Sequence, residues 1–68
     1  MTLYQFLRVI SSRTPLVLFD IGKNEICRVL TKHALSSDYL GETVFEVALG
    51  KVSSDKGPIP CLFITLRK

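Results

Sequence analysis

The chain has few metal-ligating residues and no long hydrophobic run, and each shortage excludes a class of protein. Its 68 residues include two cysteines, Cys27 and Cys61, and one histidine, His33. A structural zinc ion usually takes four such ligands, so we expect neither a metal nor another cofactor. The longest strictly apolar stretches, 16–19 and 61–64, are far shorter than the ~20 residues of a membrane-spanning helix, so we expect no membrane partner.

The chain also lacks the motifs of common enzyme classes. It contains no glycine-rich phosphate loop, no nucleophile elbow and no zinc-protease helix motif. His33 has no obvious nucleophile or orienting acid close to it in the sequence, as a catalytic base would need. The sequence therefore predicts a protein that is not an enzyme.

A disulfide is not expected, because of the compartment that the sequence indicates. No secretion signal precedes the first predicted element, so we expect a cytoplasmic, reducing location. In that environment Cys27 and Cys61 are better explained as small buried hydrophobic residues than as a bridge.

Size and composition favour association with further copies. A chain of 68 residues forms one domain, residues 1–68, and buries only about 60% of the surface that its unfolded form exposes. Small domains compensate with disulfides, a metal or oligomerisation, and the first two are not expected here. Because 47% of the residues are hydrophobic and the mean hydropathy is +0.31, the surplus apolar surface predicts a homodimer or a higher oligomer.

Apolar periodicity predicts one helix followed by four strands. Apolar residues recur at helical spacing near the start of the chain, behind a threonine that can cap the first turn. The predicted elements are a helix over 3–11 and strands over 16–21, 25–31, 43–52 and 59–67. Short turns favour antiparallel neighbours. The predicted fold is therefore α+β, with the N-terminal helix packed on a four-stranded antiparallel sheet in the order α-β-β-β-β.

Two of the predicted strands are apolar on both faces. The strands over 16–21 and 59–67 place hydrophobic side chains on either side, whereas an antiparallel sheet covered on one side should alternate. One short helix can cover only one face. We expect a second subunit to cover the other, with Phe19 or Phe63 near the interface. The alternative is closure of the sheet into a small barrel.

Polar residues in and after the second predicted strand form a candidate ligand site. Arg28 and Lys32 share one face of that strand, and His33 and Tyr39 follow in a polar connector. Arginine offers a donor fork for phosphate or carboxylate, and tyrosine a flat ring on which a base can stack. This group predicts a site for a small anionic, nucleotide-like ligand. The alternative is that Arg28 and Lys32 protect an edge strand against aggregation.

The first residues carry a resemblance to a group of phage proteins. The opening segment over 1–7, Met-Thr-Leu-Tyr-Gln-Phe-Leu, and the strand led by Pro15 resemble short uncharacterised reading frames of phages and mobile elements of Gram-positive bacteria. The resemblance covers only the first part of the chain and includes no functional motif. It implies a cytoplasmic, non-enzymatic accessory protein, of the kind that antagonises host defence by covering a surface or by sequestering a nucleotide signal.

Three functions follow, in order of preference. The first is a non-enzymatic binding protein that sequesters a small anionic ligand as an oligomer. The second is an interaction or inhibitor module that docks on a host protein through an exposed sheet edge. The third is nucleic-acid binding through dispersed basic residues, which fits the net charge of +3 although the chain has no run of lysines or arginines.

Overall fold

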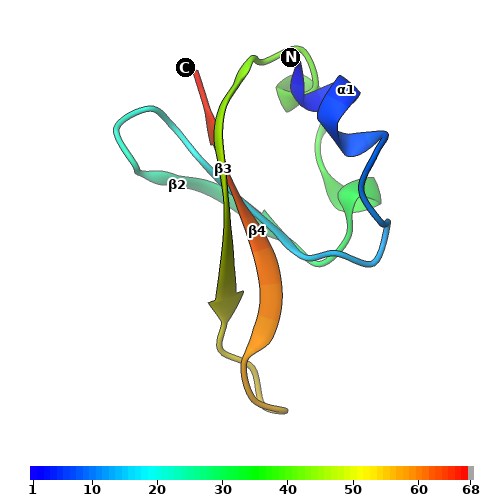
Figure 1. Cartoon of the computed structure of the whole chain (residues 1–68), viewed down its shortest axis with the longest axis vertical. Coiled ribbons are helices and arrows are strands. Elements are labelled where there is room, and N and C mark those ends of the chain that lie inside the picture. Colours follow the sequence, from blue (N-terminus) through cyan, green and yellow to red (C-terminus); the bar gives the residue numbers. More distant parts are fainter. Residues whose placement is uncertain (68) are drawn as a thin grey trace.

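The computed structural model describes residues 1–67 and confirms an α+β fold, with one short helix and a four-stranded sheet (Figure 1). The elements in chain order are α1 (Leu3–Leu7), β1 (Leu16–Phe19), β2 (Glu25–Val29), the 3-10 turns η1 (Lys32–Ala34) and η2 (Ser37–Tyr39), β3 (Val44–Val52) and β4 (Ile59–Leu66). Each predicted strand is present and is shorter than the pattern suggested: the first two stop before turn or bend residues, and Thr43, expected at the start of the third, instead forms an isolated bridge with Thr2.

α1 begins at a complete capping box, which confirms the cap that Thr2 predicts. The Thr2 hydroxyl accepts a hydrogen bond from the Gln5 N–H at 3.2 Å, and the Gln5 side-chain oxygen accepts one from the Thr2 N–H at 3.0 Å. Both Leu3 and Leu7 are buried beneath the helix. A single capped turn is therefore enough to place two leucines on the sheet.

The helix ends sooner than its apolar spacing predicts. The prediction of a helix over 3–11 is wrong in length, since α1 stops at Leu7. The carbonyl oxygens of Leu7 and Ile10 accept hydrogen bonds from the Lys32 ammonium, at 2.7 and 2.9 Å, in place of further helical N–H groups. The Lys32 side chain, from a distant part of the sequence, thus supplies the hydrogen bonds that a longer helix would have supplied to these carbonyls.

The prediction of a fully antiparallel sheet is also wrong, because the two central strands run parallel. The strand order is β2-β1-β4-β3, with β1 antiparallel to β2, β4 antiparallel to β3, and β1 parallel to β4. Two hairpins thus lie side by side, joined by the connector between β2 and β3. This arrangement places the two most apolar strands at the centre, and strands buried on both faces are typical of parallel pairs.

The main cluster of buried residues lies on one face of the sheet, which we call the covered face, although Val17 and Cys61 are also buried on the opposite face. Its buried centre consists of Leu3, Leu7, Leu16, Leu18, Ile64 and Leu66. Side chains from the α1 segment and from the connector, among them Phe6, Leu35 and Tyr39, pack against this centre. The ribbons of α1 and of the connector turns lie on the same side of the sheet (Figure 1). Phe6 is half-buried rather than fully enclosed.

The opposite face, which we call the open face, carries an aromatic pair. Phe19 and Phe63 meet edge to face with ring centroids 5.6 Å apart, and both are half-buried. They line a shallow depression of about 180 Å³. The sheet does not close, since β2 and β3 form its two edges, and the barrel alternative is therefore wrong. That a second subunit covers Phe19 and Phe63 stays a prediction.

Candidate functional site

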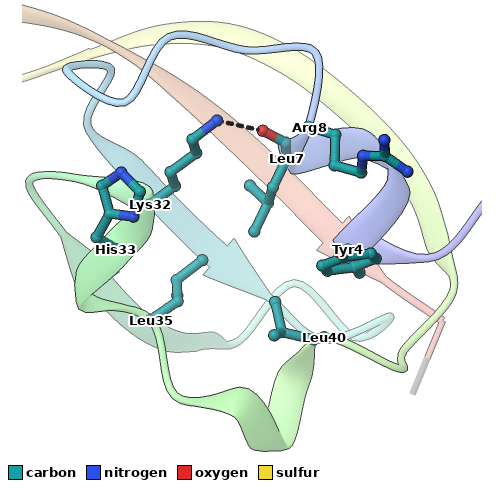
Figure 2. A pocket seen from close by; sticks show the side chains of 7 residues that line it. All are labelled: Tyr4, Leu7, Arg8, Lys32, His33, Leu35 and Leu40. Carbon is teal, nitrogen blue, oxygen red and sulfur yellow. Dashed lines mark hydrogen bonds between the residues drawn. The ribbon is translucent and has the colours of Figure 1, made fainter.

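A cleft of about 300 Å³ lies between α1 and the connector that joins β2 to β3 (Figure 2). We call it the helix–connector cleft. Its lining consists of Tyr4, Leu7, Arg8, Lys32, His33, Leu35 and Leu40. Tyr4 and Arg8 lie on the α1 side, and His33 and Leu35 lie on the opposite side (Figure 2). The cleft is therefore formed by two segments that are far apart in the sequence.

Backbone hydrogen bonds fix one end of this cleft. The N–H of Tyr4 donates to the Leu40 carbonyl at 3.0 Å, and the N–H of Leu3 donates to the Glu42 carbonyl at 2.8 Å. The Ser36 hydroxyl caps η2 by accepting from the N–H two residues later, which holds the connector in a tight turn. The first turn of α1 and the end of the connector are thus held at a defined separation.

Lys32 fixes the other end. Its ammonium donates to the carbonyls of Leu7 and Ile10, which stand where α1 ends and have no helical partner. A lysine near a helix C-terminus commonly satisfies such carbonyls. An ammonium has three donors, so these two hydrogen bonds leave one N–H of Lys32 unused by them.

The cleft combines an apolar floor with a basic rim. Three leucines form the floor, and the ring of Tyr4, which is 54% exposed, stands beside them. Arg8 and His33 are exposed at the rim, and neither aspartate nor glutamate lines the cleft. A guanidinium binds phosphate or carboxylate through paired donors, and an aromatic ring stacks on a flat partner. The site therefore suits a ligand with one anionic group and one apolar or aromatic part.

The structure brings together two of the four predicted ligand residues. Lys32 and His33 both line the cleft, whereas Arg28 does not. Arg28 lies on β2 opposite Val17, on the open face, and its guanidinium donates to the Glu25 carboxylate at 2.9 Å. The prediction that Arg28 and Lys32 share a strand face is wrong, because β2 ends before Lys32 and η1 directs Lys32 toward α1.

Tyr39 is likewise outside the cleft lining. It belongs to η2 and packs half-buried against the core. Sequence reasoning missed Tyr4 and Arg8, which do line the cleft. These two residues are four positions apart, a spacing that places side chains on the same side of a helical segment. That signal was present in the sequence, but nothing in it showed which part of the connector would face that side.

The two cysteines are free thiols on opposite faces of the sheet. Cys27 lies on the covered face and Cys61 on the open face, so they cannot approach each other to form a disulfide. Burial raises the pKa of the Cys27 thiol, and the nearby Glu25 carboxylate raises it further. Burial also raises the pKa of Cys61, and Arg28 offsets part of that shift. A raised pKa leaves a thiol protonated and weakly nucleophilic, so neither cysteine is activated for catalysis.

Residues 1–67 contain neither a metal-binding cluster nor a helix that could span a membrane. No cluster of three or more histidine, cysteine, aspartate and glutamate side chains is placed to hold a metal ion there. Within the same residues, no helix combines the length and the apolar composition that crossing a bilayer requires.

Comparison of this chain with protein-family models, with curated proteins and with solved structures found no match. What the protein binds has therefore to be inferred from its own side chains.

Proposed function

We propose that this chain is a small non-enzymatic binding protein that captures a small anionic, nucleotide-like ligand in the helix–connector cleft. The observation that carries the proposal is the cleft lining, in which three leucines and a tyrosine lie beside Arg8, Lys32 and His33 without any carboxylate. The volume of about 300 Å³ is at the lower end of the range of small-molecule sites, about 300–1,000 Å³. A ligand of the size of a single nucleotide matches both the volume and the two kinds of lining.

The lining suggests how such a ligand would lie. A base stacks on the Tyr4 ring and contacts the leucines, while a phosphate accepts hydrogen bonds from the Arg8 fork and from the third N–H of Lys32. Because the other two Lys32 donors hold the end of α1, a bound phosphate would also stabilise the junction between the helix and the connector. Ligand capture is therefore coupled to the stability of the fold.

The composition of the lining supports capture without conversion. His33 is the candidate general base there, and no serine, threonine, cysteine or carboxylate lines the cleft beside it. The cleft is formed within one chain, so capture does not need the subunit interface that sequence reasoning assumed. The resemblance to phage reading frames supports sequestration of a cytoplasmic nucleotide signal as the biological role.

Thermal unfolding in the presence of chosen ligands tests this proposal. We expect nucleoside monophosphates to raise the Tm by mass action, while the matching nucleosides and inorganic phosphate at the same concentration do not. Calorimetric titration should then give an affinity for Arg8→Gln that is weaker by about 10- to 100-fold, since a hydrogen bond to a charged group contributes about 1.5–3 kcal/mol.

Lys51→Gln is the matched control, because it removes one positive charge from β3, outside the cleft. It should leave the affinity unchanged. The proposal fails if no nucleotide stabilises the fold. It also fails if Arg8→Gln and Lys51→Gln weaken binding equally, because the attraction would then come from net charge alone.

A further inference from the structure

The two edges of the sheet differ in how they are protected against further strands. The β2 edge is five residues long and carries the ion pair between Glu25 and Arg28. The β3 edge is nine residues long, and positions 47–50 in its middle have no charge, proline or register shift. Edge strands that lack such features pair readily with another strand.

The backbone groups in the middle of β3 point outward. The N–H of Leu62 donates to the Pro15 carbonyl at 3.0 Å, so the backbone groups of Leu62 face β1. Leu62 lies opposite Leu49 in the antiparallel pair of β4 and β3. Opposed residues in such a pair either exchange two hydrogen bonds or direct their backbone groups away from each other. The N–H and C=O of Leu49 therefore face the outer edge, and those of Val47 and Lys51 do the same.

The outer edge is open over a limited stretch. At one end Met1 covers it, since the Val44 N–H donates to the Met1 carbonyl at 2.8 Å. A register shift follows directly, and the remaining residues of β3 are 46–52. We call these residues the open stretch. Its midpoint is Leu49, whose side chain is 87% exposed although it is a large hydrophobic residue.

We propose that two copies of this chain form a dimer in which their open stretches pair antiparallel around a two-fold axis at Leu49. Leu49 then lies opposite the partner's Leu49, and Val47 lies opposite the partner's Lys51. Each of these pairs exchanges two hydrogen bonds, which satisfies the outward-pointing backbone groups. The apolar side chain at the midpoint is covered by its own copy.

The length and charges of the open stretch favour this register over its neighbours. A two-fold axis at Lys51 would place two lysines opposite each other, and like charges in that position are unfavourable. An axis at Val47 would bring the partner strand against Met1, which already occupies that part of the edge. Only centring on Leu49 uses the whole open stretch and keeps the lysines apart.

This interface differs from the one that sequence reasoning placed at Phe19 and Phe63. It extends the two sheets edge to edge and leaves the aromatic pair of the open face outside the contact. Pairing of two single strands buries less area than the ~1,600 Å² of a standard interface. The dimer should therefore dissociate and re-form within the micromolar range.

Light scattering after size-exclusion chromatography tests the assembly across a concentration series. The mass should rise from 7.6 kDa toward twice that value as the concentration increases. Leu49→Lys should give a folded monomer at every concentration, because it places two lysines at the axis. Val9→Lys is the matched control, since Val9 is 78% exposed and lies outside β3, and it should dimerise like the native chain.

Cross-linking under oxidising conditions tests the register, with the native chain as the blank. Leu49→Cys should give a disulfide-linked dimer, since directly opposed Cα atoms are about 5.5 Å apart. Val47→Cys should give no cross-linked dimer. In this register Val47 lies opposite the partner's Lys51, so the two Val47 positions are offset by four residues, about 13 Å. The double variant Val47→Cys with Lys51→Cys should form a disulfide-linked dimer, because these two positions lie opposite each other across the two-fold axis.

Three outcomes would overturn the proposal. One is a native chain that stays monomeric throughout the series. Another is a dimer that survives Leu49→Lys and dissociates with Phe63→Lys, which would place the interface on the open face. The third is a monomer whose Leu49 amide becomes protected from hydrogen exchange only when an extended peptide is added, since the edge would then serve a different protein.

Discussion

The two faces of the sheet are made by the same strands but are stabilised in different ways. On the covered face Leu18 and Ile64 are fully buried under α1 and the connector turns. On the open face Phe19 and Phe63 shield each other and remain partly exposed. Neighbouring residues such as Leu18 and Phe19 thus have different surroundings, because side chains alternate along a strand. The α1 segment and the connector form a covering layer on one face only, and the open face carries the aromatic pair together with the buried side chains of Val17 and Cys61.

The open face also depends on a close approach between two strands. A Cβ added to Gly50 would clash with the ring of Phe63. The ring thus lies directly over the glycine backbone, as aromatic residues do when they cover glycines in edge strands. Gly50 is therefore required for space on this face, whereas the covered face is held by large side chains.

The largest expected effect comes from breaking the covered face. Leu18→Ala should lower the free energy of unfolding by about 2–5 kcal/mol, because it leaves a cavity at a fully buried position. The free energy of unfolding of a small domain is only about 5–15 kcal/mol, so this loss is a large fraction of it. In urea titrations at fixed protein concentration, the unfolding midpoint of the variant should therefore fall strongly. Val9→Ala, at an exposed position, should change stability by less than about 0.5 kcal/mol. If Phe19→Ala lowered the free energy of unfolding more than Leu18→Ala, the open face and not the covered face would contribute more to stability.

A smaller effect should come from Gly50→Ala on the open face. An alanine in a strand usually stabilises by roughly 0.5–1 kcal/mol relative to glycine. Here the contact with Phe63 should reverse the sign and cost about 1–3 kcal/mol through overpacking.

Gly50→Ala in a Phe63→Ala background tests whether the Phe63 ring is the cause of this loss. With the ring removed, Gly50→Ala should become neutral or stabilising when unfolding is followed in the same way. Gly41→Ala is the matched control, because an added Cβ at Gly41 meets no atom within 4 Å. Equal losses from Gly50→Ala with and without the ring would show that the backbone, and not Phe63, requires the glycine.

The smallest effect concerns the start of the helix that covers the core. Thr2→Ala removes the capping hydroxyl and should cost about 1 kcal/mol of unfolding free energy. Thr2→Ser keeps the hydroxyl and should restore most of the loss. If Thr2→Ser is as unstable as Thr2→Ala, the cap does not stabilise α1, and packing of Leu3 and Leu7 alone holds the helix in place.

Local patterns explain which parts of the fold were predictable. The cap at Thr2 and the four strands depend on residues within a few positions of one another, and all of them are present. The parallel pairing of β1 with β4 was missed, although both strands have the continuous apolar character of a central parallel pair. Sequence reasoning assigned that character to a covering subunit. An exchange of strand neighbours explains the same pattern within one chain.

The candidate site was predictable only in part, for a related reason. Lys32 and His33 were predicted from their residue types, and both line the cleft. Tyr4 and Arg8 were not predicted, because they line the cleft only when the connector folds against α1. The hydrogen bond from Lys32 to Leu7 joins residues 25 positions apart, and no periodic pattern encodes such a contact.

The sequence by itself determined the class of fold, the start of the helix and the alternation of side chains within each strand. The tertiary structure decided which strands are neighbours, where α1 ends and which backbone groups of β3 point outward. It also decided the register shift between Val44 and Glu46, which turns Val44 onto the covered face opposite Leu66. The physical reason is that propensities and caps act over a few residues. Strand order and register instead follow from competition among contacts between distant segments, which is resolved only when the whole chain packs.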